Sequence, residues 1–172
     1  MYALLGFDEL GLQYTIKAFE IAEQLGLFDP AVHSTIESQK ERRVRELSAW
    51  ALFSYDSLYR YMFCIPPLLH TPPPYPLPDP ITSPKWYGEL QVKYSMDTDN
   101  FSTYFSLLFK AKAEMCVIMN EISMCCFTES GIPTLSLKDL TSFNSRLESW
   151  FNSLPNSLHP HNIVLPGQIM LQ

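Results

Sequence analysis

The chain has 172 residues, of which 47% are hydrophobic, 13% aromatic and 17% charged, and this composition is typical of one globular domain rather than a disordered segment. Its formal net charge of -6 disfavours binding of the phosphate backbone of DNA by this chain alone. The longest charge-free run, residues 61–78, contains seven prolines, which excludes a membrane-spanning helix there.

Four cysteines stand in apolar surroundings without the CxxC spacing of zinc sites or thiol oxidoreductases. This pattern predicts reduced, buried thiols in an intracellular protein. The four are Cys64, Cys116, Cys125 and Cys126.

Residues 11–26 have apolar side chains at helical spacing opposite charged ones, which predicts an amphipathic helix. Gly26 is placed to take the left-handed conformation at its C-terminal end, and Asp29-Pro30 predicts a loop that continues to about Ser38. The residues expected to face inward are Leu12, Tyr14, Ile16, Ala18, Phe19, Ile21, Leu25 and Phe28.

A second helix is expected from about Ser38 to Pro66, whose ring removes an amide donor and ends the helix. It begins with a charged stretch, residues 40–46, which we interpret as a solvated helix face rather than a nuclear-import or phosphate-binding patch. The residues expected to face inward are Val44, Leu47, Ala51, Leu58 and Tyr61, with Trp50 and Phe53 widening the row.

Asp56 and Arg60 lie one helical turn apart in this second helix and can pair. The spacing leaves two alternatives open. One is an exposed ion pair of little energetic consequence, which is the commoner outcome. The other is a buried polar anchor that fixes how the helices pack.

Nine prolines stand between Pro66 and Pro84, and this segment, the proline arm, is expected to be extended with polyproline geometry. Apolar residues are interleaved with the prolines, which predicts that the arm packs on the helices; a docking ligand for a partner protein is the alternative. Residues 86–92 are expected to continue as a short helix or an irregular segment.

The next helix, expected over residues 101–127, is predicted to be the longest, and the polar cluster 97–100 offers capping oxygens before it. Its apolar stripe predicts the central core helix, with a ligand pocket against Met115 and Met119 as the alternative. The stripe consists of Phe101, Tyr104, Leu108, Ala111, Met115, Ile118, Ile122 and Cys125, broadened by Phe105, Met119 and Cys126.

Ser136 and Asp139 have the spacing of a capping box and predict the start of a last helix, which Pro155 ends. The residues expected on its inward side are Leu140, Phe143, Leu147, Trp150, Phe151 and Leu154. The tail, residues 155–172, has no periodicity and is expected to be irregular. Together these elements predict an all-α single domain over residues 1–172, with four or more helices packed around a central long helix and the proline arm, residues 66–84, laid over them.

Candidate catalytic and metal-binding residues are few. The four histidines lie in predicted loops without a nucleophile motif, and the pair His159 and His161 lacks the further ligands of a stable metal site. The sequence contains no GxGxxG and no GxxxxGK[ST] phosphate-binding motif. The chain is therefore not expected to be an enzyme, and no catalytic, cofactor-binding or metal-binding residue is predicted. The other two histidines are His33 and His70.

Between residues 43 and 80 the sequence resembles the fungal-specific transcription factor domain, the middle regulatory region of fungal regulators that carry a six-cysteine binuclear zinc cluster. In that family an arginine-bearing helix start leads to Trp, then Phe and Asp at three-residue steps, then a turn with proline and a loop closing on Leu-Pro. The Leu-Gly-Leu end of the first helix and the late Trp150 are also similar, whereas Ser57 stands where the family has Arg. The matching residues are Arg43, Arg45, Trp50, Phe53, Asp56, Pro66, Leu77 and Pro78.

The resemblance implies a structural role for the matching residues and a nuclear protein that takes part in regulation of RNA polymerase II transcription. Its partners would be proteins of the transcription machinery, a regulatory co-factor or a small-molecule effector, and dimer formation stays open. DNA and zinc binding would reside in the family's six-cysteine cluster, which this chain lacks, so the chain is expected to be a partial domain without a cofactor of its own. The alternatives are a stand-alone helical adaptor and an effector-binding module.

Overall fold

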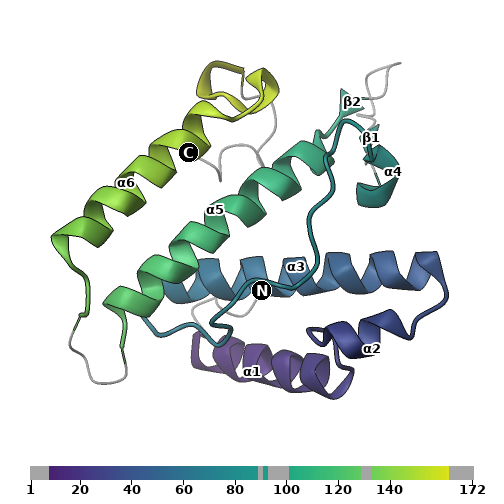
Figure 1. The fold of residues 1–172 in the computed structure, drawn as a ribbon, viewed down its shortest axis with the longest axis horizontal. Coiled ribbons are helices and arrows are strands. Elements are labelled where there is room, and N and C mark those ends of the chain that lie inside the picture. Colours follow the sequence, from purple (N-terminus) through teal and green to yellow (C-terminus); the bar gives the residue numbers. More distant parts are fainter. Residues whose placement is uncertain (1–7, 89–90, 93–100, 129–132, 163–172) are drawn as a thin grey trace.

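The computed structural model describes residues 8–88, 91–92, 101–128 and 133–162. The all-α prediction is confirmed, because long helices form the body of the domain and the described strands are a single antiparallel pair of two residues each (Figure 1). In chain order the elements are α1 (Asp8–Gln24), α2 (Pro30–Ser34), α3 (Gln39–Met62), α4 (Pro84–Tyr87), β1 (Gln91–Val92), β2 (Phe101–Ser102), α5 (Phe105–Cys126), α6 (Leu137–Asn152) and the 3₁₀ turns η2 (Asn156–Leu158) and η3 (Pro160–Asn162).

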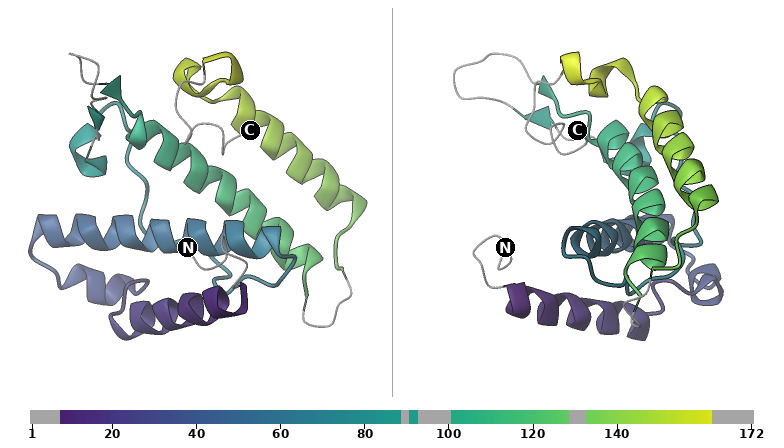
Figure 2. Two further views of the ribbon diagram at one scale, coloured as in Figure 1. Left: turned by 180° about the vertical axis from the view of Figure 1, so that it is seen from behind. Right: turned by 90° about the vertical axis from the view of Figure 1, so that its left-hand side faces the viewer.

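Helix α5 is central. It crosses α3, and α6 lies alongside it, while α1 packs against α3 at the other end of the molecule (Figures 1 and 2). The predicted role of this helix is therefore confirmed. The prediction that it is the longest is wrong, since α3 has 24 residues and α5 has 22.

The first helix buries a different face from the one expected. Phe19 and Ala22 are buried, whereas Tyr14, Ile21 and Leu25 are 59%, 47% and 58% exposed. The helix carries two apolar rows and has its main neighbour in α3, so periodicity alone does not decide which row is covered.

The segment after α1 was expected to be a loop, and this prediction is wrong in part. Gly26 does take the left-handed conformation, with φ of 59°. Asp29, however, is the N-cap of the short helix α2, where its carboxylate accepts from Ala31 N at 2.8 Å, and Pro30 occupies the first helical position.

Helix α3 starts as predicted, with Ser38 as its N-cap. Its expected inward row is wrong: Val44 and Tyr61 are 54% and 38% exposed. The buried face instead combines Trp50 and Phe53 with polar residues, because those polar side chains have partners in the chain that follows. The full buried set is Ala49, Trp50, Phe53, Ser54, Asp56, Ser57, Tyr59 and Arg60.

Helix α5 begins at Phe105, four residues later than expected, and its N-cap position is Tyr104, whose side chain makes no capping bond. The polar cluster predicted to cap it, Asp97 to Asn100, lies outside the described residues. The helix packs in two directions. Ala113 and Cys116 join a cluster with Trp50 and Phe53 of α3, and Ala111 joins a second cluster at α6 and the tail that includes Met115, Leu154 and Leu158.

Helix α6 begins with the predicted capping box, in which Ser136 and Asp139 each bond the other's backbone N–H. Leu140 and Phe151, expected on its inward side, are exposed. The described part of the tail is more regular than expected, because residues 156–162 form two 3₁₀ turns and Leu158 is fully buried.

Candidate functional site

The proline arm is held to the helices through its carbonyl groups. Proline has no N–H, so an arm rich in proline offers few backbone donors, and side chains of α3, α4 and α5 donate to its carbonyl oxygens instead. The four bonds are Arg60 Nη1 to Pro66 O (2.5 Å), Asn120 Nδ2 to Leu69 O (2.9 Å), Trp50 Nε1 to Tyr75 O (2.7 Å) and Tyr87 Oη to Pro78 O (2.5 Å). The arm therefore packs on the helices, as expected, and joins three of them.

Along the arm the side chains alternate between the protein and solvent. Pro73 and Tyr75 are buried, and the prolines on either side of Tyr75 are exposed. The Tyr75 hydroxyl donates to Leu27 O at 3.1 Å, which connects the arm to the chain after α1. Leu77 packs against the cluster formed by Trp50 and Phe53.

Asp56 and Arg60 form the buried anchor, the second of the two alternatives. Their side chains are 1% and 9% exposed, and Arg60 Nε lies 2.7 Å from Asp56 Oδ1. The other carboxylate oxygen accepts from Leu68 N at 2.9 Å. A buried ion pair is tolerated when its remaining donors and acceptors are satisfied, and here the arm satisfies both partners.

The charged start of α3 is not wholly a solvated face, contrary to prediction. Arg45 Nη2 donates to Leu25 O at 2.6 Å and to Gly26 O at 3.1 Å, so its charge stands where α1 ends and free carbonyls face it. Glu46 Oε1 lies 2.9 Å from His33 Nε2 of α2, and Glu46 Oε2 accepts from Trp86 Nε1 at 3.0 Å. Glu46 thus connects α2, α3 and α4.

The eight residues singled out by the family resemblance lie at the contacts of α3 with its neighbours. Arg45 meets the end of α1, Trp50 and Asp56 bond the arm, and the carbonyls of Pro66 and Pro78 receive donors. The other three are Phe53 and Leu77 in the core and Arg43 beside Gly88. Their arrangement is architectural and forms no acid–base or nucleophilic group.

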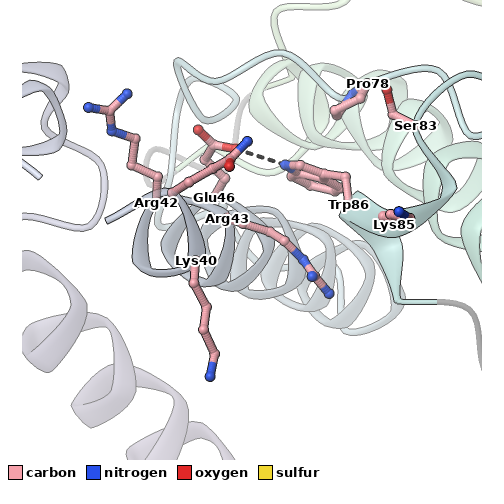
Figure 3. Close-up of a pocket in the computed structure, with 9 residues that line it drawn as sticks. Lys40, Arg42, Arg43, Glu46, Pro78, Ser83, Lys85 and Trp86 are labelled. Carbon is pink, nitrogen blue, oxygen red and sulfur yellow. Dashed lines mark hydrogen bonds between the residues drawn. The ribbon is translucent and has the colours of Figure 1, made fainter. Parts of the chain in front are cut away.

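A pocket of about 680 Å³ lies between the first turns of α3 and the segment that leads into α4 (Figure 3). Trp86 and Glu46 lie at its centre, joined by the hydrogen bond drawn there, and Arg43 runs beside the indole ring. Gly88, with φ of +69°, closes the end of α4 so tightly that a Cβ there would stand 2.9 Å from Arg43 Nη2. The remaining cations at the pocket are Lys40, Arg42 and Lys85.

Burial fixes the protonation of two groups in the core. It raises the pKa of Tyr87 to about 12, with the carboxylates of Glu114 and Asp79 adding to the effect, so the hydroxyl keeps the proton that it donates to Pro78. Burial likewise raises the pKa of Cys116 to about 11, and its thiol points at Ser54 O, 3.4 Å away. Cys116 is therefore a packing residue.

The other cysteines and histidines differ from expectation in position. Cys64 is exposed rather than buried, because α3 ends at Met62 and Cys64 takes a left-handed conformation with φ of 55° in the turn that follows. His33 belongs to α2 and His161 to η3, not to loops. Within the described residues, no group of three or more His, Cys, Asp or Glu side chains is arranged to hold a metal ion.

Sequence reasoning missed the residues that fasten the arm and build the pocket. Asn120 carried a signal, since a buried amide in an apolar helix needs a partner, and it donates to the arm. Tyr75, Lys85 and Trp86 carried none, because their roles depend on which surfaces the arm brings together.

Among the described residues, no helix is long and apolar enough to cross a membrane. Comparison of the chain with protein-family models, curated proteins and solved structures finds no match.

Proposed function

We propose that the chain is a regulatory region of a nuclear transcription regulator of the fungal zinc-cluster type, which acts through protein partners and makes no DNA contact of its own. The observation that carries the proposal is the placement of the matching residues. Arg45, Trp50 and Asp56, which match the family's spacing, each bond a different segment packed on α3. A spacing pattern maintained by one fold should have this kind of shared architectural role.

A tethering experiment tests this function. The chain is fused to a heterologous DNA-binding segment in a yeast reporter strain, and reporter output is compared with that of the DNA-binding segment alone. We expect a change in output that Trp50→Ala abolishes, because Trp50 is a core residue, and that Leu137→Ala preserves, because Leu137 is 81% exposed. Output equal to that of the DNA-binding segment alone contradicts the proposal.

The stand-alone adaptor is the second candidate, and the exposed row of α1 favours it. Four apolar side chains there share one side of the helix at spacings of 4, 7 and 4 residues, which suits contact with a partner helix. Cellular distribution separates the two functions: the protein expressed from its own complete reading frame should be nuclear if it is a regulator, and exclusion from the nucleus leaves the adaptor. The four residues are Leu10, Tyr14, Ile21 and Leu25.

A further inference from the structure

The pocket beside Trp86 gathers positive charge in an acidic protein. The whole chain carries a net charge of -6, yet four of its 12 Lys and Arg residues line this one pocket. The only carboxylate that lines it is Glu46, whose oxygens face His33 and Trp86. The four cations are Lys40, Arg42, Arg43 and Lys85.

These charges are not neutralised from within the described part of the chain. Arg42 Nε donates to a backbone carbonyl, Ile36 O, at 2.6 Å, and none of the four cations has a carboxylate within ion-pair distance among the residues that the structure describes. Like charges on neighbouring side chains repel each other, and an anion placed among them removes that repulsion. The pocket thus favours a ligand that carries more than one negative charge.

Trp86 adds a flat apolar surface to this charged site. Its indole N–H is held by Glu46 Oε2 at 3.0 Å, and its ring contacts Tyr87 edge to face with 4.7 Å between centroids. Both contacts fix the orientation of the ring. An aromatic ring held in this way beside Arg and Lys is the combination that recognises a stacked base and a phosphate group together.

We propose that this pocket binds a free nucleotide with a di- or triphosphate chain, with the base stacked on Trp86 and the phosphates among the four cations. The volume of about 680 Å³ is within the roughly 300–1,000 Å³ of small-molecule sites. Arg43 and Lys85 flank the ring, while Lys40 and Arg42 extend from α3 at the rim (Figure 3). The arrangement provides both point charges and guanidinium groups for phosphate oxygens.

The size of the charged region selects a small anion over a polymer. A nucleic acid strand would carry its phosphates beyond the pocket onto a surface whose charges are mainly acidic, since the chain has 18 Asp and Glu against 12 Lys and Arg. A mononucleotide places all its charge within the pocket. This inference does not depend on the proposed function, because a nucleotide site suits a regulator and an adaptor equally.

Isothermal titration calorimetry of the full chain with ATP tests the proposal, with adenosine and pyrophosphate as the two halves of the ligand. We expect ATP to bind, adenosine not to bind, and pyrophosphate to bind more weakly than ATP. ATP should also change the tryptophan fluorescence, and Trp86→Phe should remove this change, because Trp50 and Trp150 bond backbone carbonyls elsewhere. Absence of ATP binding at millimolar concentration overturns the proposal, and equal binding of pyrophosphate and ATP overturns the stacking of the base.

A matched pair of double variants separates local from overall charge. Lys40→Gln with Lys85→Gln removes two cations of the pocket, and Lys17→Gln with Lys138→Gln removes two exposed cations of α1 and α6. We expect the first pair to weaken ATP binding by about tenfold or more and the second by less than about twofold. Equal weakening in both overturns the site.

Two further arms guard against misreading. Gln39→Glu adds a negative charge at the pocket from an exposed position, so it should weaken ATP binding even if the double variant fails to fold, which thermal melting reveals. A single-stranded oligonucleotide or a poly-glutamate peptide that binds more tightly than ATP overturns the choice of a free nucleotide.

Discussion

One side of α5 packs against α3 and the proline arm, and the other packs against α6, and the two interfaces use different chemistry. On the α3 side, helix residues bond the carbonyls of the arm, and a buried Asp56–Arg60 pair closes its end. On the α6 side, no residue within α6 is buried to the same degree, and Trp150 is the main contact. Its indole donates to Ala111 O at 2.9 Å.

The difference shows what each kind of partner requires. Helix α6 is an amphipathic helix that satisfies its own backbone and needs only an apolar surface. The arm cannot satisfy its backbone, so α3 and α5 must present donors at fixed positions along it. Substitutions on the α3 side should therefore cost more stability than chemically similar ones on the α6 side.

Trp50→Ala should have the largest effect. Trp50 is 7% exposed, contacts Phe53 edge to face and bonds Tyr75 O, so its loss creates a cavity and frees the middle of the arm. We expect a loss of about 3–5 kcal/mol in the free energy of unfolding, measured by urea denaturation. The half-buried Trp150, changed to Ala, is the comparison and should lose less; a loss below about 1 kcal/mol at Trp50 would contradict its place in the core.

Asp56→Ala comes next and compares the two ion pairs of the interfaces. It leaves the Arg60 guanidinium buried without its carboxylate and Leu68 N without an acceptor, so unfolding free energy should fall by about 3 kcal/mol. Glu121→Ala removes the pair with Arg146 between α5 and α6, whose side chains are 36% and 39% exposed, and should cost at most about 1 kcal/mol. Equal losses would show that the arm adds nothing to the anchor.

Asp139 at the start of α6 gives a smaller effect that depends on pH. Hydrogen bonds from the hydroxyl and N–H of Ser136 lower the pKa of this exposed carboxyl below its ordinary value of 3.8. A lowered pKa in the folded state stabilises the protein above the unfolded pKa, and this stabilisation is lost as the pH falls through the folded pKa.

Thermal melting across acidic pH checks this expectation. The difference in Tm between the wild type and Asp139→Ala should be constant near neutral pH and shrink as the pH falls below about 4. Ser136→Ala should reduce the same pH dependence, because it removes the hydroxyl bond. A Tm difference that does not change with pH would contradict the bonded carboxylate.

The smallest expected signal is at Cys116, on the α3 side of α5. Its thiol is fully buried with a pKa of about 11, so almost no thiolate forms at neutral pH. Alkylation of the folded protein followed by mass spectrometry should label the exposed Cys64 and leave Cys116 unmodified until the protein unfolds. Labelling of both at one rate would mean that the α3–α5 interface opens readily.

The contrast between the interfaces also explains how much the sequence could predict. Local rules sufficed where the partner is adjacent in the chain, as with the Ser136–Asp139 box, the N-cap Ser38 and Gly26. They failed for the inward face of α3, because Asp56 and Arg60 look like surface residues until Pro66 and Leu68 fold back onto them.

The pocket was beyond sequence reasoning for a similar reason. Its cations at the start of α3 form a charge run that is typical of a solvated face. Lys85 and Trp86, some 40 residues later, reach them only because the arm returns the chain to the start of α3, where Trp86 bonds Glu46. Composition, helix count and the central place of α5 could be predicted; the site between distant segments could not.

The alternation along the arm has a consequence for how molecules meet one another. An extended segment at the surface usually presents backbone N–H groups on which a strand of another molecule can build. Here the outward positions at the middle of the arm are Pro72, Pro74 and Pro76, which have no N–H to offer, while the inward carbonyl of Tyr75 is already taken by Trp50. The arm thus stays extended at the surface without becoming a template for intermolecular β-sheet growth.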